Sequence, residues 1–217
     1  MQADRPKQYL RLGNKTILEQ TLDKLLSFAP ITGAVVVLNK SDEYWSKLNY
    51  RSSKPVLITI GGNERHHSVL NGLLRLKQIN ANNPMVLVHD AVRPLVTHTD
   101  LTNLLAAVEN YSDGGLLASP VADTLKRANM KGQCQSTVSR NQLWHAFTPQ
   151  AFTLNLLLRA LNYVVENDLQ ITDDASAVEL LGCSPRLVTS SVENIKITRS
   201  DDLNLVKAIF DFQHKNK

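Results

Sequence analysis

The sequence has little cysteine, no long hydrophobic run and no cluster of basic residues, and each shortage excludes a class of protein. The two cysteines, Cys134 and Cys183, lack disulfide-framework or metal-ligand spacing, so we expect two reduced thiols. The apolar runs are far shorter than the roughly 20 residues that cross a bilayer. The start, MQADRPKQYL, lacks the apolar core of a signal peptide. We therefore expect a cytoplasmic protein that does not bind membranes.

The distribution of charge argues against a nucleic-acid-binding protein. The formal net charge is +4, but the lysines and arginines are scattered singly, mostly beside turns and element ends. A protein that binds DNA or RNA would collect them in one stripe, so the pattern favours a small phosphorylated substrate. The 217 residues, 43% of them apolar, suit a single domain over residues 1–217 with a sizeable core.

Short apolar strands alternate with amphipathic helices over most of the chain. Thr16 and Glu19 form a capping-box pattern, and AVVVL at 34–38 is typical of a buried strand. We expect helices at 16–28, 66–78, 100–110, 153–166, 173–181 and from Ser200, and strands at 34–38, 55–60, 85–89, 114–119, 186–189 and 195–198. This alternation predicts an α/β fold with a doubly wound, mostly parallel sheet.

Residues 120–142 interrupt the alternation. Two extended, polar segments flank a turn at Lys131-Gly132, which predicts a protruding β-hairpin. Such a hairpin is either a surface excursion or an arm that packs on a second subunit.

One expected strand ends in charged residues. In MVLVHDAVRPLV, residues 85–96, Asp90 comes just after the apolar run and Arg93 follows it. Asp is rarely buried without a partner, and open α/β sheets bind ligands at the carboxyl ends of their strands. Lys196 lies between two isoleucines in an expected strand, so it points away from both and needs an anionic partner. Asp90 and Lys196 are therefore candidate site residues.

Two loops at element ends are further candidates, and each also has an ordinary structural explanation. The glycines at 61–62 form either a plain turn or a loop whose backbone reads a planar base. The Thr-Asp pair at 172–173 is an N-cap pattern that capping alone explains, although free N–H groups at a helix start also bind anions. We do not expect the adjacent His66 and His67 to face one metal ion from a helix.

Seven segments, in matching order and spacing, resemble one family. They are PKQYL, GGNER, HDAVRP, DTLKR, TPQAF, TDDASAVELLG and NIKITRSDDL. From Met1 to about Lys207 the chain is similar to the 2-C-methyl-D-erythritol 4-phosphate cytidylyltransferases. The resemblance implies a nucleotidyltransferase domain that condenses CTP with a sugar-alcohol phosphate and releases pyrophosphate. It also implies that residues 120–142 are the arm of a homodimer with active sites shared across the interface.

The resemblance assigns roles to the residues that match the family's motifs. The implied CTP-binding residues are Gly61, Gly62, Asn63, Ser68, Asp90 and Ala91, where Asn63 replaces the aspartate of many relatives. The implied substrate-binding residues are Asp90, Arg93, Thr124, Arg140, Thr148 and Thr172, with Arg140 supplied by the partner subunit. Lys7 and Lys196 are the implied catalytic cations beside the reacting phosphates. Mg²⁺ is implied as cofactor, held mainly by the triphosphate with no direct protein ligand.

The resemblance also implies a strand and a Gly-rich triphosphate loop, ending in an arginine, ahead of Met1. That strand would lie in the middle of the sheet, and the backbone N–H groups of the loop would hold the phosphates. We therefore expect a chain of this extent to fold poorly and to turn over slowly.

Two rival functions stay open. One is a cytidylyltransferase for ribitol 5-phosphate on the same fold, although LWHAFTPQ and DDASAVELLG resemble the methylerythritol enzymes more. The other is a catalytically inactive module for CTP binding or dimerisation, which would release no pyrophosphate.

Overall fold

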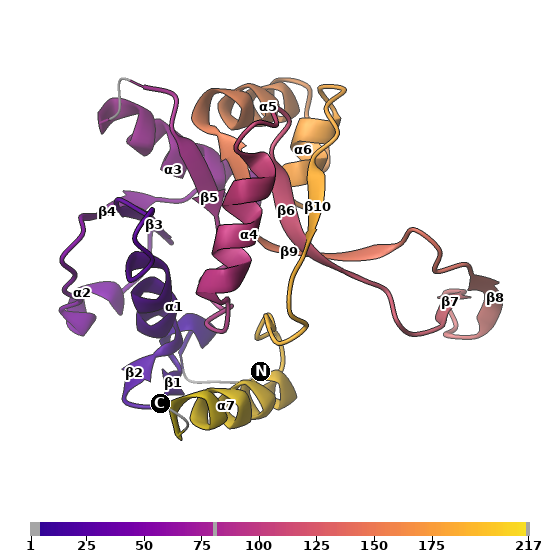
Figure 1. Cartoon of the computed structure of the whole chain (residues 1–217), viewed down its shortest axis with the longest axis horizontal. Helices are drawn as coiled ribbons and strands as arrows, with labels where there is room; N and C mark the ends of the chain where they lie inside the picture. Colours follow the sequence, from indigo (N-terminus) through magenta and orange to yellow (C-terminus); the bar gives the residue numbers. More distant parts are fainter. Residues whose placement is uncertain (1–4, 80–81, 216–217) are drawn as a thin grey trace.

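The computed structural model describes residues 5–79 and 82–215, and the expectation about Met1 lies outside them. Helices flank a sheet, and one hairpin projects from the body (Figure 1). The helices are η1 (a 3₁₀ turn, Lys7–Tyr9), α1 (Ile17–Leu26), α2 (Trp45–Leu48), α3 (Arg65–Ile79), α4 (His98–Val108), α5 (Leu154–Glu166), α6 (Asp174–Glu179) and α7 (Ser200–Lys215). The strands are β1 (Arg11–Leu12), β2 (Lys15–Thr16), β3 (Ala34–Leu38), β4 (Val56–Ile60), β5 (Met85–Val88), β6 (Gly115–Pro120), β7 (Leu125–Ala128), β8 (Cys134–Val138), β9 (Trp144–Thr153) and β10 (Arg186–Thr189).

Local sequence signals place most of these elements close to their predicted bounds. Thr16 caps α1 through the expected capping box, in which the Glu19 carboxylate accepts from the Thr16 backbone N–H at 2.7 Å. The expected strand at 195–198 is wrong: this segment is irregular. Its Ile197 N–H donates to the Val92 carbonyl at 3.0 Å, but the chain around Val92 is a turn and offers no strand to continue the ladder.

The sheet is mixed. Strands β10, β6, β9 and β5 form one sheet in that order, and β3 pairs with β4 in a separate parallel pair. Strand β10 runs parallel to β6, but β9 runs antiparallel to both β6 and β5. The pattern analysis did not predict β9. Within the described residues, β3 and β5 each have one edge without a strand partner.

Both faces of the four-stranded sheet are covered, so the doubly wound α/β expectation is confirmed. Leu116 and Leu117 are consecutive in β6 and therefore face opposite sides. Leu116 packs in the apolar cluster that contains the buried residues of α5 and α6. Leu117, fully buried, packs with α4 on the other side. Because β9 is antiparallel to its neighbours, the carboxyl ends of β5, β6 and β10 share one edge of this sheet, which is where open α/β sheets bind ligands.

The hairpin predicted for residues 120–142 is present. Strand β7 pairs only with β8, antiparallel, and the pair stands away from the body (Figure 1). Met130 at its tip is fully exposed. None of the helices in the described chain combines the length and the apolar character needed to cross a membrane.

Candidate active site at the end of strand β5

Asp90 lies just beyond the carboxyl end of β5 and has the cationic partners that its position requires. Its Oδ2 atom is 2.9 Å from Nζ of Lys196 and 3.3 Å from Nε of Arg93. The Lys196 side chain is 41% exposed, whereas that of Asp90 is 14% exposed. The expected need of Asp90 and Lys196 for oppositely charged partners is confirmed, because each is the partner of the other.

Arg93 is held in one orientation by two other segments. Its Nη1 donates to the carbonyl of Asn194 at 2.6 Å, and its guanidinium lies 5.1 Å from the centroid of the Phe147 ring. Asn194 in turn donates from Nδ2 to the carbonyl of Thr148 at 2.9 Å. Because these contacts join β9, the turn after β5 and the segment before α7, the cation stays fixed beside Asp90.

His89 and Thr148 form a short hydrogen-bond chain behind Asp90. The Asp90 backbone N–H donates to the Thr148 hydroxyl at 3.0 Å. His89 Nε2 is 3.0 Å from the carbonyl of Arg93, and its Nδ1 is 3.2 Å from the Thr148 hydroxyl. A carbonyl only accepts, so Nε2 carries the proton and Nδ1 accepts from Thr148.

Burial and neighbouring charges set the protonation of these groups. Burial by itself raises the pKa of Asp90. The hydrogen bond and charge of Lys196, with the charges of Arg65 and Arg93, bring that pKa below its ordinary value. Burial lowers the pKa of His89 to about 4. At neutral pH the site therefore holds an ionised Asp90 and a neutral His89.

We expect the free energy of unfolding to fall as the pH drops from 6.5 to about 4. The unfolded chain protonates His89 near its ordinary pKa of 6.5, whereas the folded protein resists until about 4. The unfolded state thus binds more protons in this window, which destabilises the fold by at most about 3 kcal/mol. Urea denaturation at several pH values measures this slope. His89→Gln should flatten it, and an unchanged slope in that variant would assign it to other groups.

A pocket of about 250 Å³ opens beside Asp90. It brings together five predicted site residues, which are Asp90, Arg93, Thr148, Thr172 and Lys196. Five further residues line it, and these are Arg65, Ala146, Phe147, Gln150 and Asp173. Of these, the sequence analysis named only Asp173, as part of an N-cap pattern. Three of them belong to β9. Pro149 within WHAFTPQAFT argues against a strand, so pattern analysis had no basis for placing these residues.

Gln150 connects β9 to the start of α6. It is 1% exposed; its Oε1 accepts from the Ala175 N–H at 2.8 Å, and its Nε2 donates to Asp173 Oδ2 at 2.7 Å. Asp173 caps α6 by accepting from the Ser176 N–H at 3.0 Å. The expected cap is therefore confirmed, and it leaves the exposed Thr172 at the rim of the pocket.

The loop between β4 and α3 is tightly packed around its glycines. The Gly62 N–H donates to Ser68 Oγ at 3.1 Å, and the Gly61 N–H donates to the Leu38 carbonyl at 2.8 Å. A Cβ atom on Gly61 would lie 2.6 Å from Ser68 Oγ, and one on Gly62 would lie 2.4 Å from the Cβ of His67. Glycine is therefore required here for close packing. Asn63 is exposed.

Eight predicted site residues do not line this pocket. Four of them are Gly61, Gly62 and Asn63 of the loop described above, together with Ser68, and the other four lie elsewhere. Lys7 lies in η1, and the carbonyl of Ala91 accepts from the Thr21 hydroxyl at 2.9 Å. Thr124 and Arg140 lie on the hairpin and are exposed. Arg140 donates to the carbonyl of Ala122 within the hairpin.

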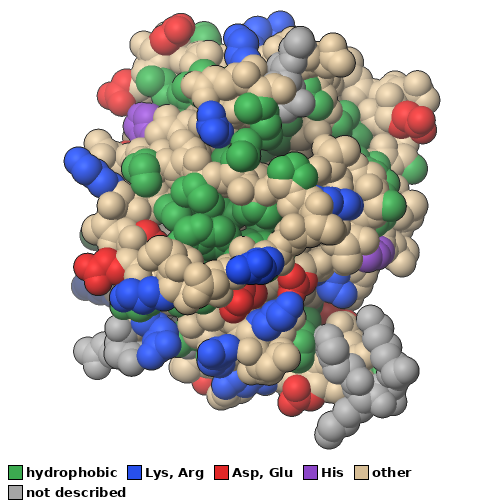
Figure 2. Space-filling model, turned by 90° about the vertical axis from the view of Figure 1, so that its left-hand side faces the viewer, with side chains coloured by type: hydrophobic (Ala, Val, Ile, Leu, Met, Phe, Trp, Pro, Cys, Tyr) green, Lys and Arg blue, Asp and Glu red, His purple; other side chains and the backbone are tan. Residues whose placement is uncertain are grey.

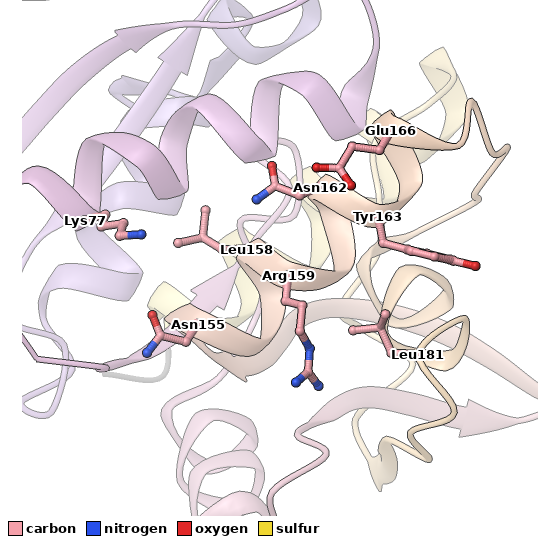
Figure 3. Close-up of a pocket in the computed structure, with 8 residues that line it drawn as sticks. All are labelled: Lys77, Asn155, Leu158, Arg159, Asn162, Tyr163, Glu166 and Leu181. Atoms are coloured by element: carbon pink, nitrogen blue, oxygen red, sulfur yellow. The ribbon is translucent and has the colours of Figure 1, made fainter.

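Two other features of the described chain contain none of the residues predicted for the site. A broader pocket of about 550 Å³ lies along α5, where Arg159 and Tyr163 point away from the helix (Figure 3). At the start of α3, Glu64, His66 and His67 bring donor atoms within 4.8 Å of one another. The Nδ1 atom of His66 is 3.4 Å from a carboxylate oxygen of Glu64, and these three side chains do not line the pocket beside Asp90.

Charges of both signs mix on one side of the molecule. Figure 2 shows the side that carries α2 and β4, with hydrophobic side chains in the middle and Lys and Arg side chains mostly below them, interspersed with Asp and Glu. Ile58 and Ile60 of β4 are 36% and 47% exposed. The described basic side chains visible on this side do not form a uniform stripe of the kind that binds nucleic acid.

Comparison with known proteins decides the family. The family model described as 2-C-methyl-D-erythritol 4-phosphate cytidylyltransferase matches residues 1–211. The chain belongs to this cytidylyltransferase family. A relative of that name from Aliivibrio fischeri is 44% identical over 207 residues, covering 95% of this chain and 87% of the relative. One from Buchnera aphidicola is 47% identical over 204 residues, covering 94% and 85%.

Solved cytidylyltransferase structures share the fold. The crystal structure of a 4-diphosphocytidyl-2C-methyl-D-erythritol synthase is 38% identical, with a TM-score of 0.86 and 95% of each chain covered. The 2-C-methyl-D-erythritol 4-phosphate cytidylyltransferase of Francisella tularensis is 33% identical, with a TM-score of 0.82, covering 94% of this chain and 93% of that one. The resemblance stated from the sequence motifs is therefore confirmed, and the chain is a nucleotidyltransferase by family.

Proposed function

We propose that this chain transfers the cytidylyl group of CTP to 2-C-methyl-D-erythritol 4-phosphate and releases pyrophosphate. The observation that carries the proposal is the cluster of Asp90, Arg93 and Lys196 in one pocket at the carboxyl end of β5. A carboxylate can accept hydrogen bonds from the hydroxyl groups of both ligands, and the two cations suit phosphate oxygens. The family and its relatives' names supply the two substrates.

The loop of Gly61, Gly62 and Asn63 is proposed to read the cytosine. Both glycine N–H groups already donate within the protein, so carbonyl oxygens and the exposed Asn63 amide are the groups left to face the base. The exocyclic amino group of cytosine is a donor and matches such acceptors. The replacement at position 63 matters little if the base is read through backbone groups. If relatives read it through the aspartate carboxylate, the neutral asparagine should lower the affinity for the base.

The proposed chemistry is a single in-line displacement. A phosphate oxygen of the sugar-alcohol phosphate attacks the α-phosphorus of CTP, the bond from that phosphorus to the bridging oxygen of the β-phosphate breaks, and pyrophosphate leaves. Positioning and neutralisation of charge drive such a reaction. Lys196, held by Asp90 and 41% exposed toward the pocket, is proposed to neutralise the charge that develops, together with Lys7.

The pocket's own carboxylates do not form a ready site for Mg²⁺. Asp90 is bound to two cations, and Asp173 accepts from Gln150 and from the Ser176 N–H. Mg²⁺ usually keeps several waters and binds substrate phosphates through few carboxylates. We propose that the triphosphate supplies its ligands, and that the ion neutralises phosphate charge when bound.

Pyrophosphate release from CTP, with Mg²⁺ and either 2-C-methyl-D-erythritol 4-phosphate or ribitol 5-phosphate, tests the function. We expect release with the first substrate and little with the second. The same assay on a chain extended ahead of Met1 by the family's strand and Gly-rich loop tests the expected importance of that segment. Nucleotide binding without release from either chain would favour an inactive CTP-binding module.

We also propose a homodimer in which the hairpin at 120–142 reaches the partner's site. The hairpin strands pair only with each other, and Thr124 and Arg140 on it are exposed. Arg140→Ala should raise the KM for 2-C-methyl-D-erythritol 4-phosphate about tenfold or more, because a charge-assisted contact to phosphate is lost. An effect confined to the KM for CTP would contradict the assignment.

Mixing two impaired variants, at a concentration of 2-C-methyl-D-erythritol 4-phosphate below the wild-type KM, tests the shared site directly. If Arg140 acts in the partner's pocket, a dimer of one Arg140→Ala subunit and one Lys196→Ala subunit contains one intact site. Random mixing should then recover about a quarter of the wild-type activity. A mixture with no recovered activity, in dimers shown to exchange subunits, would place Arg140 in its own subunit's site.

A further inference from the structure

Arg65 and Asp174 form a forked ion pair between two helix starts. Arg65 is the first residue of α3, and Asp174 is the first residue of α6. Nη1 and Nη2 of Arg65 donate to the two carboxylate oxygens of Asp174 at 3.0 and 2.7 Å. The Asp174 side chain has no exposed surface, whereas that of Arg65 is 38% exposed. A carboxylate buried to this degree depends on its paired cation.

The two ends of this ion pair belong to the two halves of the proposed site. Arg65 directly follows the loop of residues 61–64, which is proposed to read the cytosine. Asp174 directly follows Thr172 and Asp173, which line the pocket on the side proposed for the sugar-alcohol phosphate. The ion pair therefore spans 109 positions of sequence and joins the nucleotide side to the substrate side.

The start of α6 has one other side-chain anchor among the described contacts at residues 173–175. Gln150 of β9 binds Asp173 and the Ala175 N–H, which ties α6 to the sheet. Arg65 ties it instead to α3 and the loop ahead of it. With both anchors, Thr172 has a defined position at the rim. Without Arg65, the start of α6 would keep the Gln150 hydrogen bonds and the apolar packing of α6 against α5, but no link to α3 through Asp174.

We propose that Arg65 is a positioning residue for the sugar-alcohol phosphate: through Asp174 it holds the Thr172-Asp173 edge of the pocket in register with the nucleotide loop. The inference rests on the proposed function. A gain in folding stability does not by itself account for the Arg65–Asp174 pair, because buried ion pairs often add little net stability over apolar side chains. Geometry is the better reason, because a forked guanidinium fixes the direction as well as the distance of the carboxylate.

Steady-state kinetics of Arg65→Gln and Asp174→Asn test the proposal, with Arg75→Gln as control. Arg75 lies on the same helix, where its Nη1 donates to Oε1 of Gln78 at 2.9 Å, the one hydrogen bond it makes among the described residues. We expect Arg65→Gln to lower kcat/KM for 2-C-methyl-D-erythritol 4-phosphate by about 100-fold, mostly through KM, because a small displacement of a positioning group has effects of this size. The Kd for CTP should change less than about threefold, and Arg75→Gln should resemble the wild type. Asp174→Asn keeps the side-chain shape and should show a smaller loss of the same kind.

Equal losses for CTP and for the sugar-alcohol phosphate in Arg65→Gln would overturn the proposal, and so would an unchanged KM. If Arg65→Gln fails to fold, Asp174→Asn tests the proposal instead: its KM for the sugar-alcohol phosphate should rise while its Kd for CTP stays nearly unchanged. Amide hydrogen exchange over residues 170–178 adds a readout that needs no turnover, and we expect faster exchange there than over α5. Failure of the proposed function is distinguishable, because the wild type would then release no pyrophosphate. In that case unchanged exchange in both variants would still reject the positioning role.

Discussion

Lys196→Ala is expected to lower kcat about 1,000-fold while leaving the Kd for CTP within a few-fold of the wild type. The Lys196 ammonium is 2.9 Å from Asp90 and faces the pocket. In the proposed reaction its charge matters most when negative charge moves onto the leaving pyrophosphate. An interaction that strengthens in the transition state appears in kcat rather than in ground-state binding.

Single-turnover rates and equilibrium binding of CTP separate these two quantities. Lys207→Ala in α7 is a suitable control, because that lysine is exposed and lies outside the pocket. Equal losses in turnover and in CTP affinity would show that Lys196 serves binding and has no special role in the transition state.

Asp90→Ala is expected to have the largest combined effect on stability and activity. The substitution leaves Arg93, which is 7% exposed, without its carboxylate. Removing one partner of a buried pair costs about 3 kcal/mol or more of unfolding free energy, because the remaining charge is uncompensated. Turnover should fall as well, because Lys196 loses the group that orients it.

The pH dependence of the free energy of unfolding separates the contribution of the Asp90 charge from that of the side-chain shape. The pKa of Asp90 is lowered in the folded protein, so its contribution is present above the ordinary pKa of 3.8 and is lost as the pH falls through the folded pKa. Asp90→Asn keeps the shape and should lose that contribution at pH 7 while matching the wild type in strong acid. Urea denaturation of both proteins at neutral and acid pH measures the difference between their free energies of unfolding. If that difference is the same at every pH, the charge of Asp90 contributes nothing to stability.

Local chemistry made much of this fold predictable. The capping box at Thr16, the β-branched run of β3 and the glycine-containing turn at 131–132 each specify structure within a few residues. They were therefore readable without knowledge of the rest of the chain. The same holds for Asp90, since an acid at the end of an apolar strand needs a partner wherever the chain supplies one.

Strand β9 shows where local chemistry is insufficient. Its sequence, WHAFTPQAFT, contains a proline and no clean alternation, so its strand conformation depends on β5 and β6 pairing with it from both sides. Thr148, Gln150 and Phe147 reach the pocket only because of that pairing. The residues adjacent in sequence do not predict this pairing.

The order of residues alone established the class of fold, the family motifs and the need of Asp90 and Lys196 for opposite charges. Only the tertiary structure showed that these two residues satisfy one another and that Arg65 binds Asp174. Such contacts join residues separated by more than a hundred positions of sequence, here 109. Their geometry is decided by how the sheet and its helices pack. Periodicity and capping patterns extend over one element and so carry no information about that packing.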